Sequence, residues 1–176
     1  MKFKGIISAA AAALALILAL TGCSGSGGTE IELTDEVTGG QGASRDDVWY
    51  LDTGSVKLAP HDNFTSVSAY LGDPVSKDES PSCAYIGYDK VFVFKGFTVQ
   101  TYPENGVDFV LWISLTDQSV KTPQGVGIGS TKEEVIAATG VEYEDRGDSI
   151  VYSKGKTSLS FIFTGGRATV VQYLAD

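Results

Sequence analysis

The chain has 176 residues, of which 43% are hydrophobic and 10% aromatic, a composition typical of a globular protein and not of a disordered one. This length fits one ordinary domain with appendages. The formal net charge of -9 argues against nucleic acid as a partner, because nucleic-acid binders present basic patches, and against electrostatic adhesion to anionic lipid.

The first 23 residues have the organisation of an export signal. Lys2 and Lys4 precede an apolar stretch at residues 6–20, which is too short to span a bilayer comfortably and suits the hydrophobic region of a signal peptide. The stretch ends in Leu-Thr-Gly-Cys at residues 20–23. This resembles a lipobox, where lipoprotein signals are cut before a cysteine that carries diacylglycerol. The resemblance implies a signal peptide over residues 1–22 and lipidation of Cys23.

Lipidation would decide where the protein is found. Stable attachment needs more than one acyl chain, and a diacylated Cys23 meets that condition. We therefore expect a lipid anchor in the cell membrane or the outer membrane, with the folded part extracytoplasmic. Ser24 follows the cysteine, so the sequence carries no aspartate signal for inner-membrane retention.

Residues 23–47 are predicted to be a flexible acidic linker. Glycine, serine and acidic residues dominate, and the sizeable apolar residues are Ile31, Leu33 and Val37. Such a composition buries too little surface to offset the entropy of ordering. Apolar patterning begins at Val48, so we place the domain at residues 48–176.

Two segments within this domain resemble each other. Each has a short x-Val-x-Leu/Ile run, at residues 55–58 and 125–128, then a helical stretch that ends at Gly72 or Gly140. In the second stretch Ser130 or Thr131 can cap the helix, and Thr131 with Glu134 has the spacing of a capping box. The pattern predicts two tandem units, at about 55–117 and 123–176.

Three strand-like stretches follow each predicted helix. The first unit has them at 84–88, at 91–94 with 97–102, and at 109–115, and the second has them at 150–153, 158–163 and 168–174. Apolar and polar residues alternate within them, and turn residues separate them. The sequence therefore predicts an α+β fold of tandem αβββ repeats, an antiparallel sheet with helices packed on one side.

This tandem resembles the β-lactamase inhibitor protein family and the small lipoprotein of the outer-membrane barrel-assembly machinery. It is also similar to lipoproteins of anaerobic gut bacteria through three motifs, at residues 96–103, 114–117 and 125–135. These motifs are structural, so the resemblance implies a fold and carries no functional residue except the lipidated Cys23.

The residues that most often perform chemistry are few. With Cys23 lipidated, Cys83 is left without an intramolecular disulfide partner, and we expect it to be buried or half-buried. His61 is the only histidine and is predicted to lie in a surface loop, where Ser55 or Ser66 could partner it although nothing marks either one.

No metal or cofactor is predicted. The chain lacks a Cys-x-x-Cys motif and a histidine pair, and the acidic cluster of Glu142, Glu144, Asp145 and Asp148 does not have the spacing of an EF-hand. The glycine-rich run at 125–130 lacks the lysine of a phosphate-binding loop, and we interpret it as a turn into the second helix.

Aromatic residues offer a candidate binding surface. By strand alternation Trp112 lies opposite Leu111 and Ile113, and Tyr102 lies opposite Phe97 and Val99. Together with Tyr173 they would suit recognition of a protein or a glycan. The alternative is that the rings pack beneath loops or under residues 48–51.

Three functions remain open. The first is a non-enzymatic module that binds a protein or another component of the envelope. The second is an inhibitor of a secreted or envelope enzyme, which would insert the loop at 103–106 or at 74–81 into the enzyme. The third is a small hydrolase, which would need two perturbed carboxylates or a serine beside His61.

Overall fold

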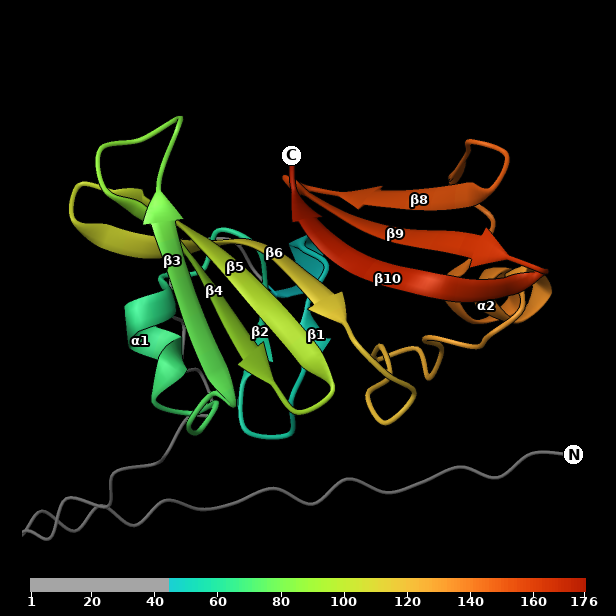
Figure 1. The fold of residues 1–176 in the computed structure, drawn as a ribbon. Coiled ribbons are helices and arrows are strands. Elements are labelled where there is room, and N and C mark those ends of the chain that lie inside the picture. The colour runs from blue at the N-terminus through green and yellow to red at the C-terminus, as the bar shows by residue number, and fades with distance from the viewer. Residues whose placement is uncertain (1–44) are drawn as a thin grey trace, which may run out of the picture. The chain divides into compact units, whose positions relative to one another are not determined.

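The computed structural model describes residues 45–176 (Figure 1). The predicted signal peptide, Cys23 and the linker up to residue 44 lie outside the described residues. The elements are a 3-10 helix η1 (Arg45–Asp47), β1 (Leu51–Asp52), β2 (Lys57–Leu58), α1 (Phe64–Ser68), β3 (Ser76–Pro81), β4 (Tyr88–Phe94), β5 (Phe97–Glu104), β6 (Val107–Leu115), α2 (Lys132–Thr139), β7 (Glu144–Asp145), β8 (Ser149–Lys154), β9 (Thr157–Thr164) and β10 (Arg167–Ala175).

One antiparallel sheet of eight strands, in the order β3-β4-β5-β6-β10-β9-β8-β7, forms most of the domain. Two runs of consecutive strands, β3 to β6 and β7 to β10, meet where β6 pairs with β10 through three residue pairs. Figure 1 shows these two parts side by side, each with one helix. Strands β1 and β2 form a separate two-stranded sheet.

The predicted α+β class, with helices packed on one side of a sheet, is wrong. The described residues are mostly β, and only 12% of them are helical. Helices α1 and α2 have five and eight residues, and together they bury only Phe64, Val67 and Val135. Much of the remaining apolar cover comes from extended chain before α1, because the same core cluster includes Trp49, Leu51, Val56 and Leu58.

Most predicted strands overlap an observed one, but the first does so only at Tyr88. Residues 84–88 form an exposed loop up to the start of β4 at Tyr88, and the chain pairs earlier, in β3. Every residue of β3 is exposed, so this edge strand has no apolar alternation from which to predict it. Its charges and Pro81 are typical of an edge that must not pair with another chain.

A β-bulge interrupts β6. Gln100 pairs with Trp112 and Thr101 pairs with Val110, so Leu111 has no partner on β5. The extra residue shifts the alternation, and Val110 is fully buried whereas Leu111 is half-buried. The prediction that Leu111 and Ile113 form one regular face therefore fails at this point.

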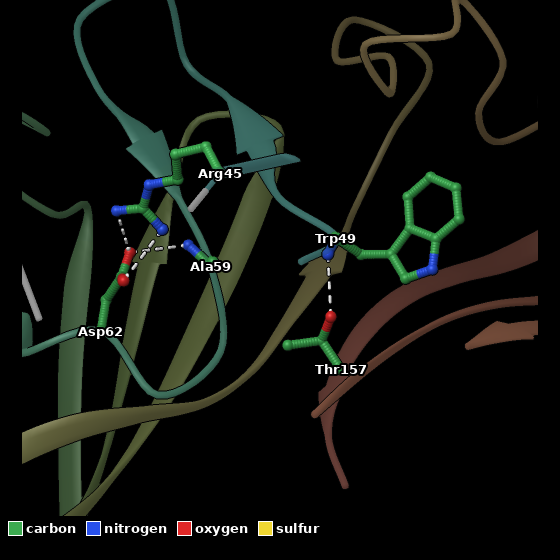
Figure 2. A network of polar contacts seen from close by, with 5 residues as sticks. All are labelled: Arg45, Trp49, Ala59, Asp62 and Thr157. Atoms are coloured by element: carbon green, nitrogen blue, oxygen red, sulfur yellow. Dashed lines mark hydrogen bonds and ion pairs between the residues drawn. The ribbon is translucent and has the colours of Figure 1, made fainter. Parts of the chain in front are cut away.

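The N-terminal end of the described chain is fixed to the first part of the sheet domain (Figure 2). Both terminal nitrogens of Arg45 donate to the carboxylate of Asp62 at 3.0 Å, and the Ala59 amide donates to it at 2.8 Å. Burial raises the pKa of Asp62 above its usual range, and the Arg45 guanidinium offsets part of that effect. Contacts with the domain therefore extend to the first described residue, Arg45.

The same segment also reaches the second part. The Trp49 amide donates to the Thr157 hydroxyl at 2.8 Å, as Figure 2 shows, and the Lys154 ammonium lies 4.6 Å from the centroid of the Trp49 ring. Residues 45–49 therefore contact both halves of the sheet. Within residues 45–176 no helix is long and apolar enough to cross a bilayer.

Candidate functional site

The connection between β3 and β4 carries an exposed apolar surface. Ile86 is fully exposed, and Tyr85 and Tyr88 are each about half exposed, with relative accessibilities of 44% and 52%. Figure 1 shows this connection as a long loop that projects past the end of β3. We call residues 82–88 the apolar loop. Single exposed apolar side chains are common on protein surfaces, but several that are close together can mark an interaction site.

Contacts within the loop give it a defined shape. The Ser82 amide donates to the Gly87 carbonyl at 3.0 Å, and the Tyr85 amide donates to the Ser82 hydroxyl at 3.3 Å. The Tyr85 ring lies against the Tyr102 ring with a centroid distance of 4.9 Å. A loop held in this way loses little conformational entropy when it binds.

Tyr102, one of the three predicted binding residues, packs against the apolar loop through the Tyr85 ring. It is only 8% exposed and packs between Tyr85 and Phe109, whose ring centroid is 5.9 Å away. Burial, with the nearby charge of Glu104, raises the pKa of its hydroxyl. The Tyr102 ring therefore contacts other rings and is almost completely shielded from water.

The other two predicted residues do not join it. Tyr173 is completely buried in the core, paired between Ile113 and Leu159, and offers no ring to a partner. Trp112 is half-buried and pairs with Gln100 and Leu174 away from the apolar loop. The predicted surface of Trp112, Tyr102 and Tyr173 is therefore not one continuous patch.

His61 lies in a turn with a positive φ of 68° and is half-buried. Its Nδ1 is 3.4 Å from the Tyr102 hydroxyl, and its Nε2 is 3.2 Å from the Lys156 carbonyl. Neither contact is a serine, so the pairing of His61 with Ser55 or Ser66 is not formed. The histidine joins the first part of the domain to the β8–β9 turn.

Cys83 is exposed, and the prediction that it is buried or half-buried is wrong. The expectation rested on the apolar residues that follow it, which would have drawn a strand into the core. Those residues form the apolar loop instead, so the thiol lies at the surface beside them.

Two of the four carboxylates of the acidic cluster, Glu144 and Asp145, form ion pairs with basic neighbours. Lys132 contacts Asp145 at 2.8 Å and Arg146 contacts Glu144 at 2.8 Å. Hydrogen bonding to Lys132 lowers the pKa of Asp145. Within residues 45–176 no group of three or more histidine, cysteine and acidic side chains is placed to hold a metal ion.

The sequence contains a signal for the apolar loop that its interpretation as a strand missed. From Ser80 to Tyr88 there is no charged residue, and Pro81 and Gly87 bracket the apolar residues. Proline and glycine at such positions mark a loop, and a loop with uncharged apolar residues is a candidate interaction site.

Comparisons with known proteins add little to this geometry. No family model and no curated protein matches the chain. Among solved structures, it is similar to a crystal structure of a DUF4309 family protein (YjgB) from Bacillus subtilis subsp. subtilis str. 168, with 18% identity and a TM-score of 0.39, over 68% of this chain and 82% of that one. This is a distant fold match. Neither a lipoprotein family nor the β-lactamase inhibitor family is confirmed.

Proposed function

We propose that the protein is a membrane-anchored extracytoplasmic lipoprotein whose domain binds a protein of the cell envelope. Diacylated Cys23 holds the chain at the cell membrane or the outer membrane, as its likeness to bacterial lipoproteins implies. The domain acts by binding and not by catalysis, with the apolar loop as its contact surface.

The exposure of Ile86 is the observation that carries this proposal. Its side chain stands free between two half-exposed tyrosines on a loop without charge. Tyrosine and aliphatic side chains that fill a partner's pocket are the usual centre of a protein interface. The rings beneath the loop hold it in one conformation before binding.

The partner that fits this surface is a protein with an apolar pocket. The loop itself presents no charge, and the edge strand β3 beside it carries Lys77, Asp78 and Glu79 in contact with water. A rim of mixed charge around an apolar centre is the common arrangement of such interfaces.

Site-specific photo-crosslinking in living cells tests the proposal. The full chain carries a photoreactive phenylalanine at position 86, and a matched control carries it at position 141, where Val141 is also highly exposed at 79%. We expect one discrete crosslinked species from position 86 and none from position 141. The same products from both positions, or none from position 86, would contradict the proposed contact surface.

The second candidate, an enzyme inhibitor, would use the same loop. The two loops that the sequence suggested for inhibition are less suitable. Most of residues 74–81 is the paired strand β3, and residues 103–106 form the end of β5 with a tight turn. The apolar loop projects instead and could enter a cleft. Inhibition of a secreted serine hydrolase that is lost in Ile86→Asp would favour this candidate. No contact of the described residues favours the third candidate, a small hydrolase.

A further inference from the structure

An open surface cavity of about 620 Å³ lies between the loop after β6 and the start of α2, away from the aromatic residues discussed above. The loop after β6, the first turn of α2 and the first residue of β10 line it. Its polar side chains include Gln118, Lys121, Glu134 and Arg167, and Val126 and Ile128 supply apolar contact. These four polar side chains are exposed, so the cavity is open to water.

Small residues in the loop bring its polar side chains close to the backbone. A Cβ atom at Gly127 would lie 3.0 Å from Cδ of Lys121, and one at Gly129 would lie 2.9 Å from the Gln118 amide nitrogen. The Lys121 and Gln118 side chains therefore lie across the glycine backbone and border the cavity. The glycine-rich run is thus part of the cavity wall as well as a turn into α2.

The charged side chains of the cavity differ in how many hydrogen-bond or ion-pair partners they have. Arg167 donates to the Gly129 carbonyl at 2.7 Å, which leaves the rest of its guanidinium available, and Lys121 has no ion pair or hydrogen bond to the other described residues. Glu134 is engaged, because its carboxylate accepts the Thr131 amide at 2.8 Å in the capping box. Two cations face one occupied carboxylate, in a protein whose formal net charge is -9.

We propose that this cavity binds a small hydroxylated anion, such as a sugar acid or a sugar phosphate. Lys121 and Arg167 hold the anionic group, since charge-assisted hydrogen bonds to carboxylate or phosphate are the strongest that these side chains make. Gln118 and the free lone pairs of Glu134 contact hydroxyl groups, and Val126 and Ile128 contact the carbon skeleton. This site does not depend on the lipid anchor or on the apolar loop.

The experiment is a titration of the full chain in detergent, labelled with ¹⁵N, against three probes. Glucuronate and glucose 6-phosphate carry the two kinds of anion on the same skeleton, and glucose is the neutral control. We expect either acid to shift the amide signals of residues 125–130, and glucose to leave them in place. Whichever acid binds more tightly identifies the anion as carboxylate or phosphate.

Substitutions separate this site from nonspecific attraction. Lys121→Gln and Arg167→Gln are each expected to weaken binding about tenfold, as loss of one charge-assisted contact does. Arg167→Lys retains the charge and should recover part of that loss. Lys156→Gln, at an exposed lysine in the β8–β9 turn, is the matched control and should bind as the wild type does.

Two results would overturn the proposal. The first is that neither acid shifts the signals at millimolar concentration, or that glucose shifts them equally. The second is that Lys121→Gln and Arg167→Gln bind the acids as tightly as Lys156→Gln. Because the probes do not touch the apolar loop, either failure leaves the protein-binding proposal standing.

Discussion

Two buried tyrosines differ in a single polar contact. Tyr152 and Tyr173 pair with Leu159 from opposite sides in the sheet, and both rings belong to the core. The Tyr152 hydroxyl donates to the Gly140 carbonyl at 3.1 Å, whereas the Tyr173 hydroxyl has no hydrogen-bond partner among the described residues. An unsatisfied buried hydroxyl destabilises a fold, so the two residues make a matched comparison.

Replacement of each tyrosine by phenylalanine should have opposite effects. We expect Tyr173→Phe to leave the free energy of unfolding unchanged or to raise it by up to about 1 kcal/mol, because it removes a polar group that bonds to nothing. Tyr152→Phe should lower it by about 1 kcal/mol through loss of one hydrogen bond. Urea denaturation measures both, and a Tyr173→Phe variant less stable than Tyr152→Phe would contradict the assignment.

The same hydroxyl makes stability depend on pH in alkaline solution. Burial, helped by nearby Tyr50, raises the pKa of Tyr173 far above the value of about 10 that it has in the unfolded chain. Above about pH 10 the unfolded chain releases this proton and the folded chain keeps it, so rising pH favours unfolding. Wild type should therefore lose stability relative to Tyr173→Phe from about pH 10 upward. Parallel stability curves for the two proteins would refute this.

At the scale of elements, the predictions that were confirmed concern features determined by residues close together in the sequence. The capping box expected from Thr131 and Glu134 is present at the start of α2, with the Glu134 amide donating to the Thr131 hydroxyl at 3.2 Å. Alternation also identified residues of β5, where Val99 and Thr101 are fully buried. Both features depend only on the spacing of nearby residues, which can be read from the sequence.

Substitution of Thr131 tests how much the capping box contributes to the stability of the fold. Thr131→Ala removes the hydroxyl that accepts the Glu134 amide and should lower the free energy of unfolding by about 1 kcal/mol. Thr65→Ala, on the exposed side of α1, is the control and should have little effect, since alanine favours helix. Equal stability of the two variants in thermal or urea unfolding would show that the cap is not used.

Features that depend on distant contacts could not be predicted. Strand β3 is polar on both faces because it is an edge, and only its pairing with β4 reveals it. The apolar residues at 84–86 have the composition of a strand but are exposed, and of these Tyr85 packs against the distant Tyr102. The bulge at Leu111 likewise depends on its pairing with β5. The fold class failed for the same reason, since extended chain covers core that helices were expected to cover.

At the scale of the whole molecule, three residue pairs between β6 and β10 join the two parts of the sheet, and the N-terminal segment strengthens the connection. Arg45 binds Asp62 in the first part, and Trp49 binds Thr157 in the second. In addition, Gly155 in the β8–β9 turn lies directly against the Asp47 backbone. Residues 45–49 therefore act as a clamp between the two parts of the domain.

Two glycines of nearly equal conformation test this clamp. Gly155 and Gly165 have φ values of +59° and +60°, so alanine costs each about 1 kcal/mol in backbone strain. At Gly155 the new methyl group would also collide with the Asp47 carbonyl, whereas nothing surrounds Gly165. We expect Gly155→Ala to be the less stable and to shift the NMR signals of residues 45–49. Equal losses, with those signals unmoved, would mean that the segment does not clamp the two parts.

The proposed placement of the domain beside a bilayer rests on lipidation of Cys23, which lies outside the described residues. The resemblance of residues 20–23 to a lipobox is the reason to expect this modification, and the net charge of -9 disfavours electrostatic attraction to anionic lipid. Intact-mass spectrometry of the natural protein, extracted from its cells with detergent, tests this directly. The account predicts a chain that begins at Cys23 and carries the added mass of a diacylglyceryl group. A chain that begins elsewhere, or begins at Cys23 without lipid, would contradict it.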